Sequence, residues 1–454
     1  MILWFGKLFN LLRSREFRRS TFHFNWAIVD QAVVSGANFA ISILLARTMG
    51  AERFGAFVLA WMAVNLIQAI QHSAINTVVL TIGPKLENAA RASHDSFIFL
   101  QQVVFGTVTA LISWLGVHFL SSLRPDWHLD SLALPLAFAV LFCQTQDFFR
   151  RYLFSIQRPN VGFLVDLIRY LSPFGLLLVY IQWGPGTLTA AAVLWIIGLS
   201  AALAVASAIY FVPKLTWTGS TLWSAAQSNW RFSKWLVASS ILSWGWGNLN
   251  YFAAAILIGA SATAYLRVAQ TLLGFTNILF LGIENVLPIQ SSRKFVEGGI
   301  PALNRYLIKI ALIGLIPTVI VDGFFVLFPL PALSFFFGNA YAPASSIVQL
   351  YALADVIFFL TVPAMVWLRT VEQTRRIFHA YLASFVTSII IVYPAISYLG
   401  TTGAAVSILV VTIVNLTALA IGIRWSLHKL VDAGAIERNA RPEPTISVSW
   451  DNKL

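Results

Sequence analysis

Residues 402–427 read TGAAVSILVVTIVNLTALAIGIRWSL, and the only charged residue in this stretch is Arg424, close to its end. A helix needs about 20 apolar residues to cross a hydrocarbon layer ~30 Å thick, so this stretch is long enough to span a membrane. Similar stretches recur along the chain of 454 residues, of which 58% are hydrophobic and 11% are charged. With a mean hydropathy of +0.77, the sequence predicts an all-α, polytopic membrane protein.

The apolar stretches predict twelve membrane-spanning helices. Ser, Gly, Asn and Pro occur inside several of them, which membrane helices tolerate where neighbouring helices or an internal cavity satisfy the freed backbone groups. The predicted spans are 24–46, 56–82, 97–121, 131–154, 160–182, 187–212, 234–258, 263–290, 306–330, 345–368, 376–398 and 402–427.

The distribution of basic residues predicts the orientation of the chain. Lys and Arg collect in short cytoplasmic loops, and nearly all of the 30 Lys and Arg residues fall on the side that holds both termini. The opposite side carries only Arg47, Arg53 and Arg124, while Arg169 and Arg267 fall within spans. We therefore expect both termini in the cytoplasm (N-in and C-in). The net charge of +12 is explained by membrane topology and does not indicate nucleic-acid binding.

The arm, the central linker and the tail lie outside the predicted spans. Residues 1–23 form a basic cytoplasmic arm, either an amphipathic helix on the anionic leaflet or a solvated arm. Residues 214–232 are expected to be a cytoplasmic linker, and the cytoplasmic tail 428–454 is expected to be disordered. Cys143 is the only cysteine, which excludes an intramolecular disulfide, and its place within a span predicts a core residue.

Local similarities indicate an internal repeat. Residues 45–60, between the first two spans, and residues 258–269, between the seventh and eighth, both contain Gly-Ala followed by an aromatic residue and then Ala. Transporters are often built from two structural halves around a central site. We expect two six-helix bundles, 24–213 and 233–427, in the same orientation, because each half has an even number of spans.

Polar residues at helical spacing predict a cavity between the two halves, since residues at i, i+3, i+4 and i+7 share a helix face. The residues expected to bind substrate there are Arg267, Arg169, Gln31, Asn38, Asn65, Gln68, Gln270 and Asn277. A second explanation stays open, in which these side chains hold neighbouring helices together. Gly245 and Gly247 permit bending or close helix approach and are candidate hinge residues.

Carboxyl groups inside the membrane are the candidates for coupling to an ion gradient, because a charge at the centre of a spanning helix costs about 2.5–3.5 kcal/mol on insertion scales. These candidates are Asp30, Glu284, Asp322 and Asp166, and Asp355 is a further carboxyl within a span. Asp166 and Arg169 are three residues apart, so an internal salt bridge between them is an alternative role for both.

Motifs of enzyme chemistry are not visible. The sequence contains no phosphate-binding GxxxxGK[ST] loop, no His-Glu-x-x-His motif and no Cys/His spacing of a metal site. We therefore expect neither catalysis nor a resident metal or cofactor. An ion gradient or the membrane potential would supply the energy for moving a substrate across the membrane.

Three motifs resemble one transporter family. Residues 44–55, LLARTMGAERFG, are similar to the first hairpin of Wzx-type polysaccharide flippases. Residues 264–270, AYLRVAQ, resemble that family's eighth helix, and residues 337–344, FGNAYAPA, resemble its loop between helices nine and ten. The resemblance implies membership of the multidrug/oligosaccharidyl-lipid/polysaccharide (MOP) exporter superfamily, with two six-helix bundles around a V-shaped cavity and alternating access.

The resemblance also implies a cargo. This would be an undecaprenyl-diphosphate-linked oligosaccharide, moved across a bacterial inner membrane for exopolysaccharide, capsule or O-antigen, with a polysaccharide polymerase and glycosyltransferases as further partners beside membrane lipids. Cationic side chains and amides in the cavity would replace the hydration of the diphosphate and glycan. Two alternatives stay open: a cation-coupled drug or metabolite exporter of the same fold, and a membrane scaffold of a glycosyltransferase complex.

Overall fold

The computed structural model describes residues 15–83, 86, 88–123, 129–156, 158–184, 186–211 and 219–432. All regular structure in these ranges is helical, which confirms the all-α prediction. The helices are α2 (Arg15–Gln71), a π-helix (His72–Asn76), α3 (Thr77–Thr81), α4 (Asn88–Leu123), α5 (Asp130–Ser155), α6 (Pro159–Trp183), α7 (Ala190–Ala208), a 3-10 turn (Ile209–Phe211), α8 (Gly219–Leu257), α9 (Ala260–Leu272), α10 (Gly274–Leu327), α11 (Pro329–Phe336), a 3-10 helix (Asn339–Ala344), α12 (Ser345–Thr370) and α13 (Thr374–Asp432).

Eight helices of the described chain are long and apolar enough to cross a membrane. Two of them, in α2 and α13, each hold two predicted spans joined by a tight turn. The turns lie at Gly50, with φ 75°, and at Gly400, with φ 60°. Glycine adopts this backbone without the steric cost that a Cβ brings. The multi-pass architecture is thus confirmed, while the count of twelve and the orientation stay predictions.

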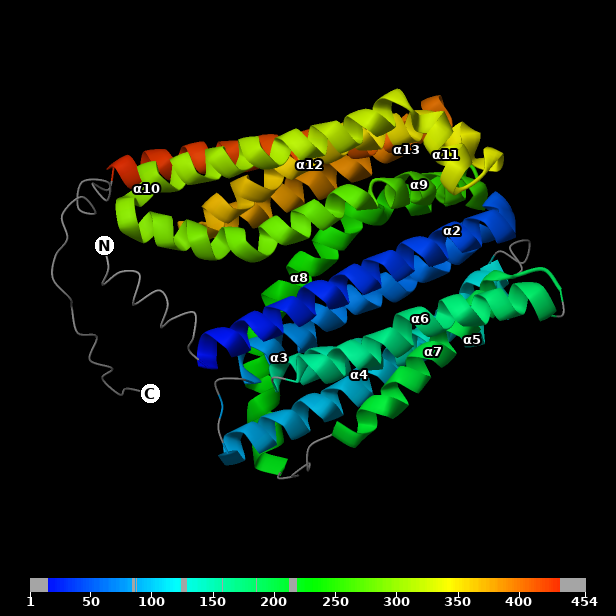
Figure 1. Cartoon of the computed structure of the whole chain (residues 1–454), viewed down its shortest axis with the longest axis horizontal. Helices are drawn as coiled ribbons and strands as arrows, with labels where there is room; N and C mark the ends of the chain where they lie inside the picture. The colour runs from blue at the N-terminus through cyan, green and yellow to red at the C-terminus, as the bar shows by residue number, and fades with distance from the viewer. Residues whose placement is uncertain are drawn as a thin grey trace.

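The helices form two bundles (Figure 1). In the first, α5 packs on α4 and α7, and α6 packs on α2 and α7; in the second, α12 packs between α10 and α13. Helix α8 contacts both bundles, because it packs against α13 and also against α2 and the π-helix. It begins at Gly219, so the part of the expected linker 214–232 from residue 219 onward is helical.

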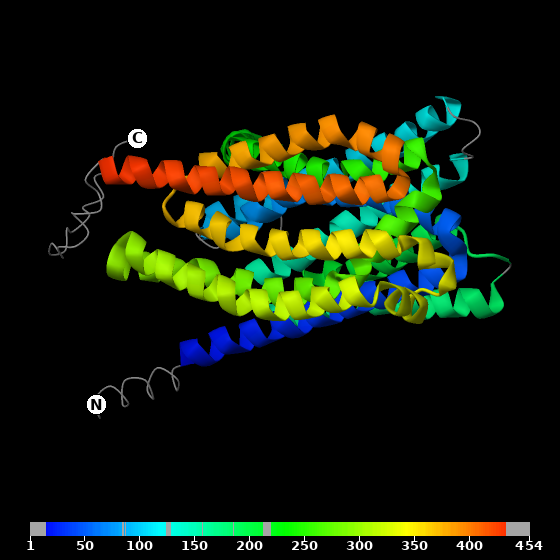
Figure 2. The ribbon, with the colours of Figure 1, turned by 90° about the horizontal axis from the view of Figure 1, so that it is seen from above.

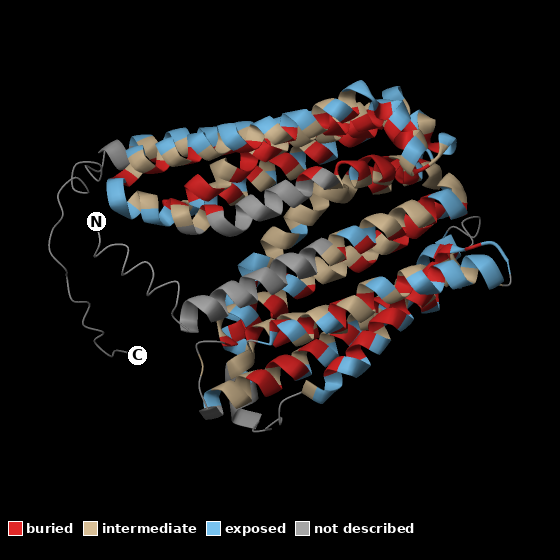
Figure 3. Cartoon of the chain, viewed as in Figure 1, coloured by how far each residue is buried: buried red, intermediate tan, exposed pale blue. Residues whose placement is uncertain are grey.

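The exposed faces of the bundles are apolar. On α4, Val103, Ile112 and Phe119 are about 60% exposed, whereas the buried residues of both bundles face neighbouring helices (Figure 3). An apolar exterior around a partly polar interior is the arrangement that a hydrocarbon solvent favours, because unpaired polar groups are costly in lipid.

The two bundles meet at one end of the molecule. The start of α2 and the end of α13 both lie at the other end, on different bundles, and we call this the terminal end (Figures 1 and 2). At the meeting end, residues of α2, α9 and the 339–344 helix share one apolar cluster that includes Leu45, Phe54, Leu266 and Tyr341. The residues 1–14 of the expected arm and 433–454 of the expected tail lie outside the described residues.

Candidate functional site

Four contacts between the bundles close the meeting end, and we call this set the clasp. Arg47 donates from Nε to the carbonyl oxygen of Phe336 at 2.7 Å and from a terminal guanidinium nitrogen to that of Phe335. Tyr341 donates its hydroxyl hydrogen to the Ala46 carbonyl at 2.9 Å. The Thr263 hydroxyl lies 3.1 Å from the Gly55 carbonyl and shares its hydrogen with the Ala260 carbonyl of its own helix at 2.6 Å.

Gly55 allows the closest approach in the clasp. A Cβ at this position would lie 1.8 Å from the carbonyl oxygen of Ala260 and 2.9 Å from Oγ1 of Thr263. Because the obstacle at Ala260 is backbone, it cannot rotate away as a side chain would. The contact between α2 and α9 therefore requires glycine at residue 55.

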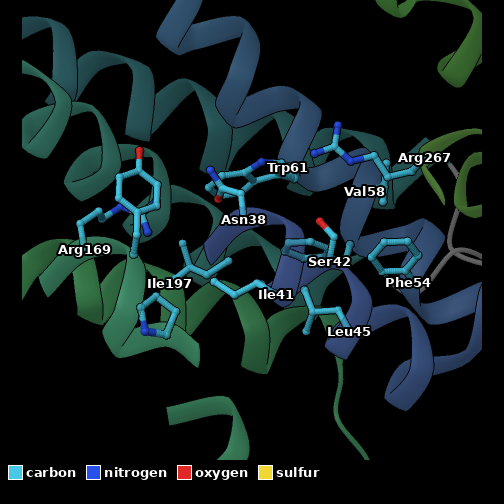
Figure 4. A pocket seen from close by; sticks show the side chains of 13 residues that line it. Asn38, Ile41, Ser42, Leu45, Phe54, Val58, Trp61, Arg169, Ile197 and Arg267 are labelled. Atoms are coloured by element: carbon cyan, nitrogen blue, oxygen red, sulfur yellow. The ribbon is translucent and has the colours of Figure 1, made fainter. Parts of the chain in front are cut away.

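A pocket lies beside the clasp, between the bundles, with a volume of about 50 Å³ open to the centre of a water molecule. Arg169 and Arg267 reach it from opposite sides, and Asn38, Ser42 and Trp61 lie between them (Figure 4). Its lining residues are Asn38, Ile41, Ser42, Leu45, Phe54, Phe57, Val58, Trp61, Arg169, Tyr170, Pro173, Ile197 and Arg267. Among these described lining residues only Arg267 comes from the second bundle, so movement between the bundles changes the distance between the two cations.

Arg169 is a buried cation on α6, with 4% of its surface exposed. Its Nη2 donates to the Cys143 sulfur at 3.1 Å, and its guanidinium lies 5.1 Å from the Tyr170 ring centre. Its Nε has no hydrogen-bond partner among the described residues. None of the described carboxylates forms an ion pair with it. A buried charge held this way is costly unless a carboxylate or a ligand compensates it.

Asp166 does not pair with Arg169, contrary to the alternative considered from their spacing. Its Oδ2 lies 2.5 Å from Nε of Arg150, and its Oδ1 accepts a hydrogen bond from Gln146 at 2.7 Å. Both partners come from α5. Asp166 therefore binds side chains of the neighbouring helix instead of Arg169, which lies three residues further along its own helix. This ion pair within the first bundle leaves Arg169 without a carboxylate partner among the described residues, and the ion-coupling role of Asp166 stays a prediction.

Arg267 is held by an amide and not by an acid. Its Nη1 donates to Oε1 of Gln270 at 2.9 Å, and the Tyr251 hydroxyl donates to the same oxygen at 3.0 Å. Gln270 thus does not line the pocket itself but orients Arg267 at its edge. As for Arg169, no carboxylate in the described chain pairs with this guanidinium.

Two of the polar residues predicted to bind substrate, Asn65 and Gln68, lie on the same arm of α2 as the pocket residue Trp61. Trp61 lines the pocket, and Asn65 and Gln68 follow it at i+4 and i+7 on the same helix, toward the terminal end. These two residues are partly exposed but do not line the pocket itself. Their role in substrate binding stays a prediction.

Four sequence-predicted residues have side chains outside the described set. Asp30 and Gln31 lie on the first arm of α2, and Asn277 and Glu284 lie on the first arm of α10. The candidate hinge residues sit in a continuous stretch of α8. A Cβ at Gly245 would lie 2.6 Å from the Phe385 ring, whereas nothing lies within 4 Å of one at Gly247. Gly245 therefore serves close helix approach, and Gly247 is free to serve bending.

The aromatic lining was missed by the sequence analysis. Phe54, Phe57 and Trp61 share one face of α2, and the Phe57 and Trp61 rings stack at 6.1 Å between centres. Their i, i+3 and i+7 spacing was available, but the same spacing describes any apolar helix face that packs in a core. No group of three or more His, Cys, Asp or Glu side chains in the described residues is placed to hold a metal ion.

Comparisons with protein-family models and with curated proteins find no match. Solved structures do match. An inward-facing MATE family multidrug resistance transporter of the MOP superfamily has a TM-score of 0.69 at 14% identity, covering 88% of this chain and 95% of that chain. The lipid II flippase MurJ in an inward closed conformation has a TM-score of 0.69 at 12% identity, covering 86% and 87%.

A third match is a MOP superfamily transporter from Pyrococcus furiosus whose binding pocket is described as having reverse polarity. Its TM-score is 0.64 at 13% identity, covering 95% of this chain and 98% of that chain. These matched proteins are transporters and not enzymes, and at such identities the likeness concerns the fold. The chain therefore has the fold of the transporters of the MOP superfamily.

Proposed function

We propose that this protein is a flippase for an undecaprenyl-diphosphate-linked oligosaccharide in a bacterial inner membrane, serving the synthesis of a surface polysaccharide. The observation that carries the proposal is the pair Arg169 and Arg267, which face one pocket from two bundles without a carboxylate partner in the described chain. A diphosphate supplies several oxygen acceptors and at least two charges, which match two guanidinium groups.

The rest of the pocket suits the glycan next to the diphosphate. Asn38 and Ser42 provide hydrogen-bonding groups, and Trp61 and Tyr170 provide aromatic faces on which a sugar ring packs. The clasp closes the pocket at the end opposite the termini. With both termini in the cytoplasm, this conformation is inward-facing and admits the substrate from the cytoplasmic leaflet, as alternating access requires.

A cation-coupled drug exporter is the second candidate. Such a protein needs carboxylates in its binding pocket to attract cationic compounds, and the fold is shared with multidrug transporters. The described lining contains two arginines and no acidic residue, which favours an anionic substrate. A scaffold for a polysaccharide polymerase or glycosyltransferases would not need the two cations at all.

The test is a leaflet-translocation assay with the purified full chain in proteoliposomes that contain undecaprenyl-diphosphate-linked oligosaccharide. We expect the parent protein to expose the glycan on the far leaflet and Arg169→Gln and Arg267→Gln to lose this activity. Lys234→Gln is the matched control, because Lys234 is an exposed cation on α8 beside Trp235, remote from the pocket lining. Translocation that is equal in all four proteins would overturn the proposal.

A further inference from the structure

The second bundle carries a groove on its outer side, near the end of α13 (Figures 1 and 2). The volume of this groove open to the centre of a water molecule is about 360 Å³, whereas a single water needs only about 10–15 Å³ of such space. The groove is therefore wide enough for an organic ligand. Asp322, which is 1% exposed, does not line it, and the ion-coupling role of Asp322 stays a prediction. The described lining residues are Ala420, Ile423, Arg424, Leu427 and His428.

These lining residues share one face of the second arm of α13, because they are spaced at i, i+3, i+4, i+7 and i+8. Ile423 and Leu427 are partly buried against the apolar core of the second bundle. Ala420, Arg424 and His428 form an exposed ridge beside them, about 12 Å long at the rise of an α-helix. The groove thus has an apolar wall and becomes cationic toward the terminal end.

The cationic end of the groove is not neutralised within the protein. No described carboxylate forms an ion pair with Arg424 or His428. The neighbouring Trp425 is 56% exposed, and the Arg376 guanidinium lies 4.1 Å from its ring centre. Gly422 permits this contact between the two arms of α13, since a Cβ there would lie only 3.2 Å from Cβ of Arg376. A third cation therefore lies next to the groove.

We propose that this groove binds one anionic phospholipid of the leaflet at the terminal end. The phosphate lies at Arg424 and His428, because a guanidinium binds phosphate oxygens with two parallel hydrogen bonds. An acyl chain covers Ala420, Ile423 and Leu427, which a free phosphate would leave uncovered. With both termini in the cytoplasm, as the basic residues predict, this leaflet is the anionic cytoplasmic one.

The lining also selects among phospholipids. Phosphatidylcholine carries a cationic headgroup beyond its phosphate, and the described lining offers no carboxylate to pair with it. The glycerol headgroup of phosphatidylglycerol is uncharged and meets no such cost. The inference concerns a lipid that stays bound at the outside of the protein, so it does not rest on the proposed transport function.

The first experiment maps the lipid on the full chain, delipidated in detergent, with phosphatidylglycerol that carries a diazirine in one acyl chain. We expect photo-cross-links within residues 420–428, competed by unlabelled phosphatidylglycerol and about ten-fold less well by phosphatidylcholine. Inorganic phosphate should not compete. Equal competition by phosphatidylcholine, displacement by inorganic phosphate alone, or no cross-link in this segment overturns the proposal.

The second experiment separates the charge of the groove from its apolar wall. Arg424→Gln should weaken phosphatidylglycerol binding about ten-fold, whereas Arg375→Gln, an exposed cation of α13 outside the lining, should not.

Ala420→Trp keeps the cations but fills the groove, so it should displace the lipid. Ile421→Trp, at a position 62% exposed and outside the lining, is its control. Because the substituted side chains are exposed, the core of the bundle stays intact. Parent affinity in both Arg424→Gln and Ala420→Trp would mean that Arg424 only anchors the helix at the membrane surface, and it would overturn the site.

Discussion

At the residue scale, the central feature is a charge that the protein leaves unpaired. Arg169 is buried beside a thiol and an aromatic ring, although a carboxylate lies three residues before it on the same helix. Asp166 forms an ion pair with Arg150 from α5, which leaves the Arg169 guanidinium without a carboxylate partner in the described chain. A group selected for stability alone would be neutral at this position.

This arrangement predicts opposite effects on stability and binding. Arg169→Met should be at least as thermally stable as the parent, because it removes an uncompensated buried charge. Its affinity for undecaprenyl diphosphate should fall by about ten-fold or more, since a hydrogen bond to a charged group contributes roughly 1.5–3 kcal/mol. Melting curves and quenching of tryptophan fluorescence in detergent measure the two quantities.

The control for this prediction is Lys234→Met, which removes an exposed cation and should leave affinity unchanged. If Arg169→Met binds undecaprenyl diphosphate with the affinity of the parent, the Arg169 side chain contributes to packing and not to binding. A strong loss of stability in that variant would point to the same conclusion.

At the scale of elements, α8 departs most from the sequence-based expectation. Residues 214–232 were predicted to be a linker between the two halves, yet the helix already begins at Gly219. Asn229, 4% exposed, explains this, because its amide donates to Gln101 of α4 at 2.6 Å. Trp223 and Trp230 remain exposed on the other face, as interfacial helices show.

The two glycines of α8 give a matched pair of variants. Gly245→Ala should lower the melting temperature, because its Cβ would press on the Phe385 ring at 2.6 Å. Gly247→Ala meets nothing within 4 Å and should stabilise the helix by about 0.5–1 kcal/mol. We nevertheless expect Gly247→Ala to slow translocation, because it stiffens the helix that links the bundles.

Melting temperatures and initial translocation rates of the two variants decide between packing and bending. If Gly247→Ala is more stable and as fast as the parent, α8 does not bend at this position during transport. A slow Gly245→Ala alone would indicate that only its contact with α13 matters.

At the scale of the whole molecule, the sequence predicted the helical membrane fold and left the conformation open. Apolar length and the positions of glycine suffice for the spans, because each depends on local chemistry. The clasp depends on backbone carbonyls at residues 46, 55, 335 and 336, and every residue has such a carbonyl. The partner of Asp355 is likewise a threonine 79 residues away in sequence, which no local pattern indicates.

The clasp predicts how the equilibrium between conformations responds to one methyl group. Gly55→Ala cannot keep the close contact with Ala260, so the population should shift toward the state that is open at the clasp end. The substitution Ser42→Cys places a thiol in the pocket. Reaction of this thiol with a membrane-impermeant reagent added from outside reports the opening. The native Cys143 is buried and adds little background.

We expect Ser42→Cys to be protected from the outside in the parent background and labelled when Gly55→Ala is also present. Gly36→Ala on the same helix is the control, because a Cβ there has no neighbour within 4 Å. Equal labelling in both backgrounds would mean that the clasp does not limit access to the pocket.

The choice of acceptors in the clasp has a consequence for mutational tolerance. Arg47 donates to the main-chain oxygens of Phe335 and Phe336, and a substitution at either position keeps the oxygen in place. In a saturation screen for surface polysaccharide, position 47 should therefore accept few residues, while position 335, whose ring is 72% exposed, should accept many. The sequence of the second bundle can therefore change at positions 335 and 336 without loss of the contact. The first bundle, in contrast, must keep arginine at position 47.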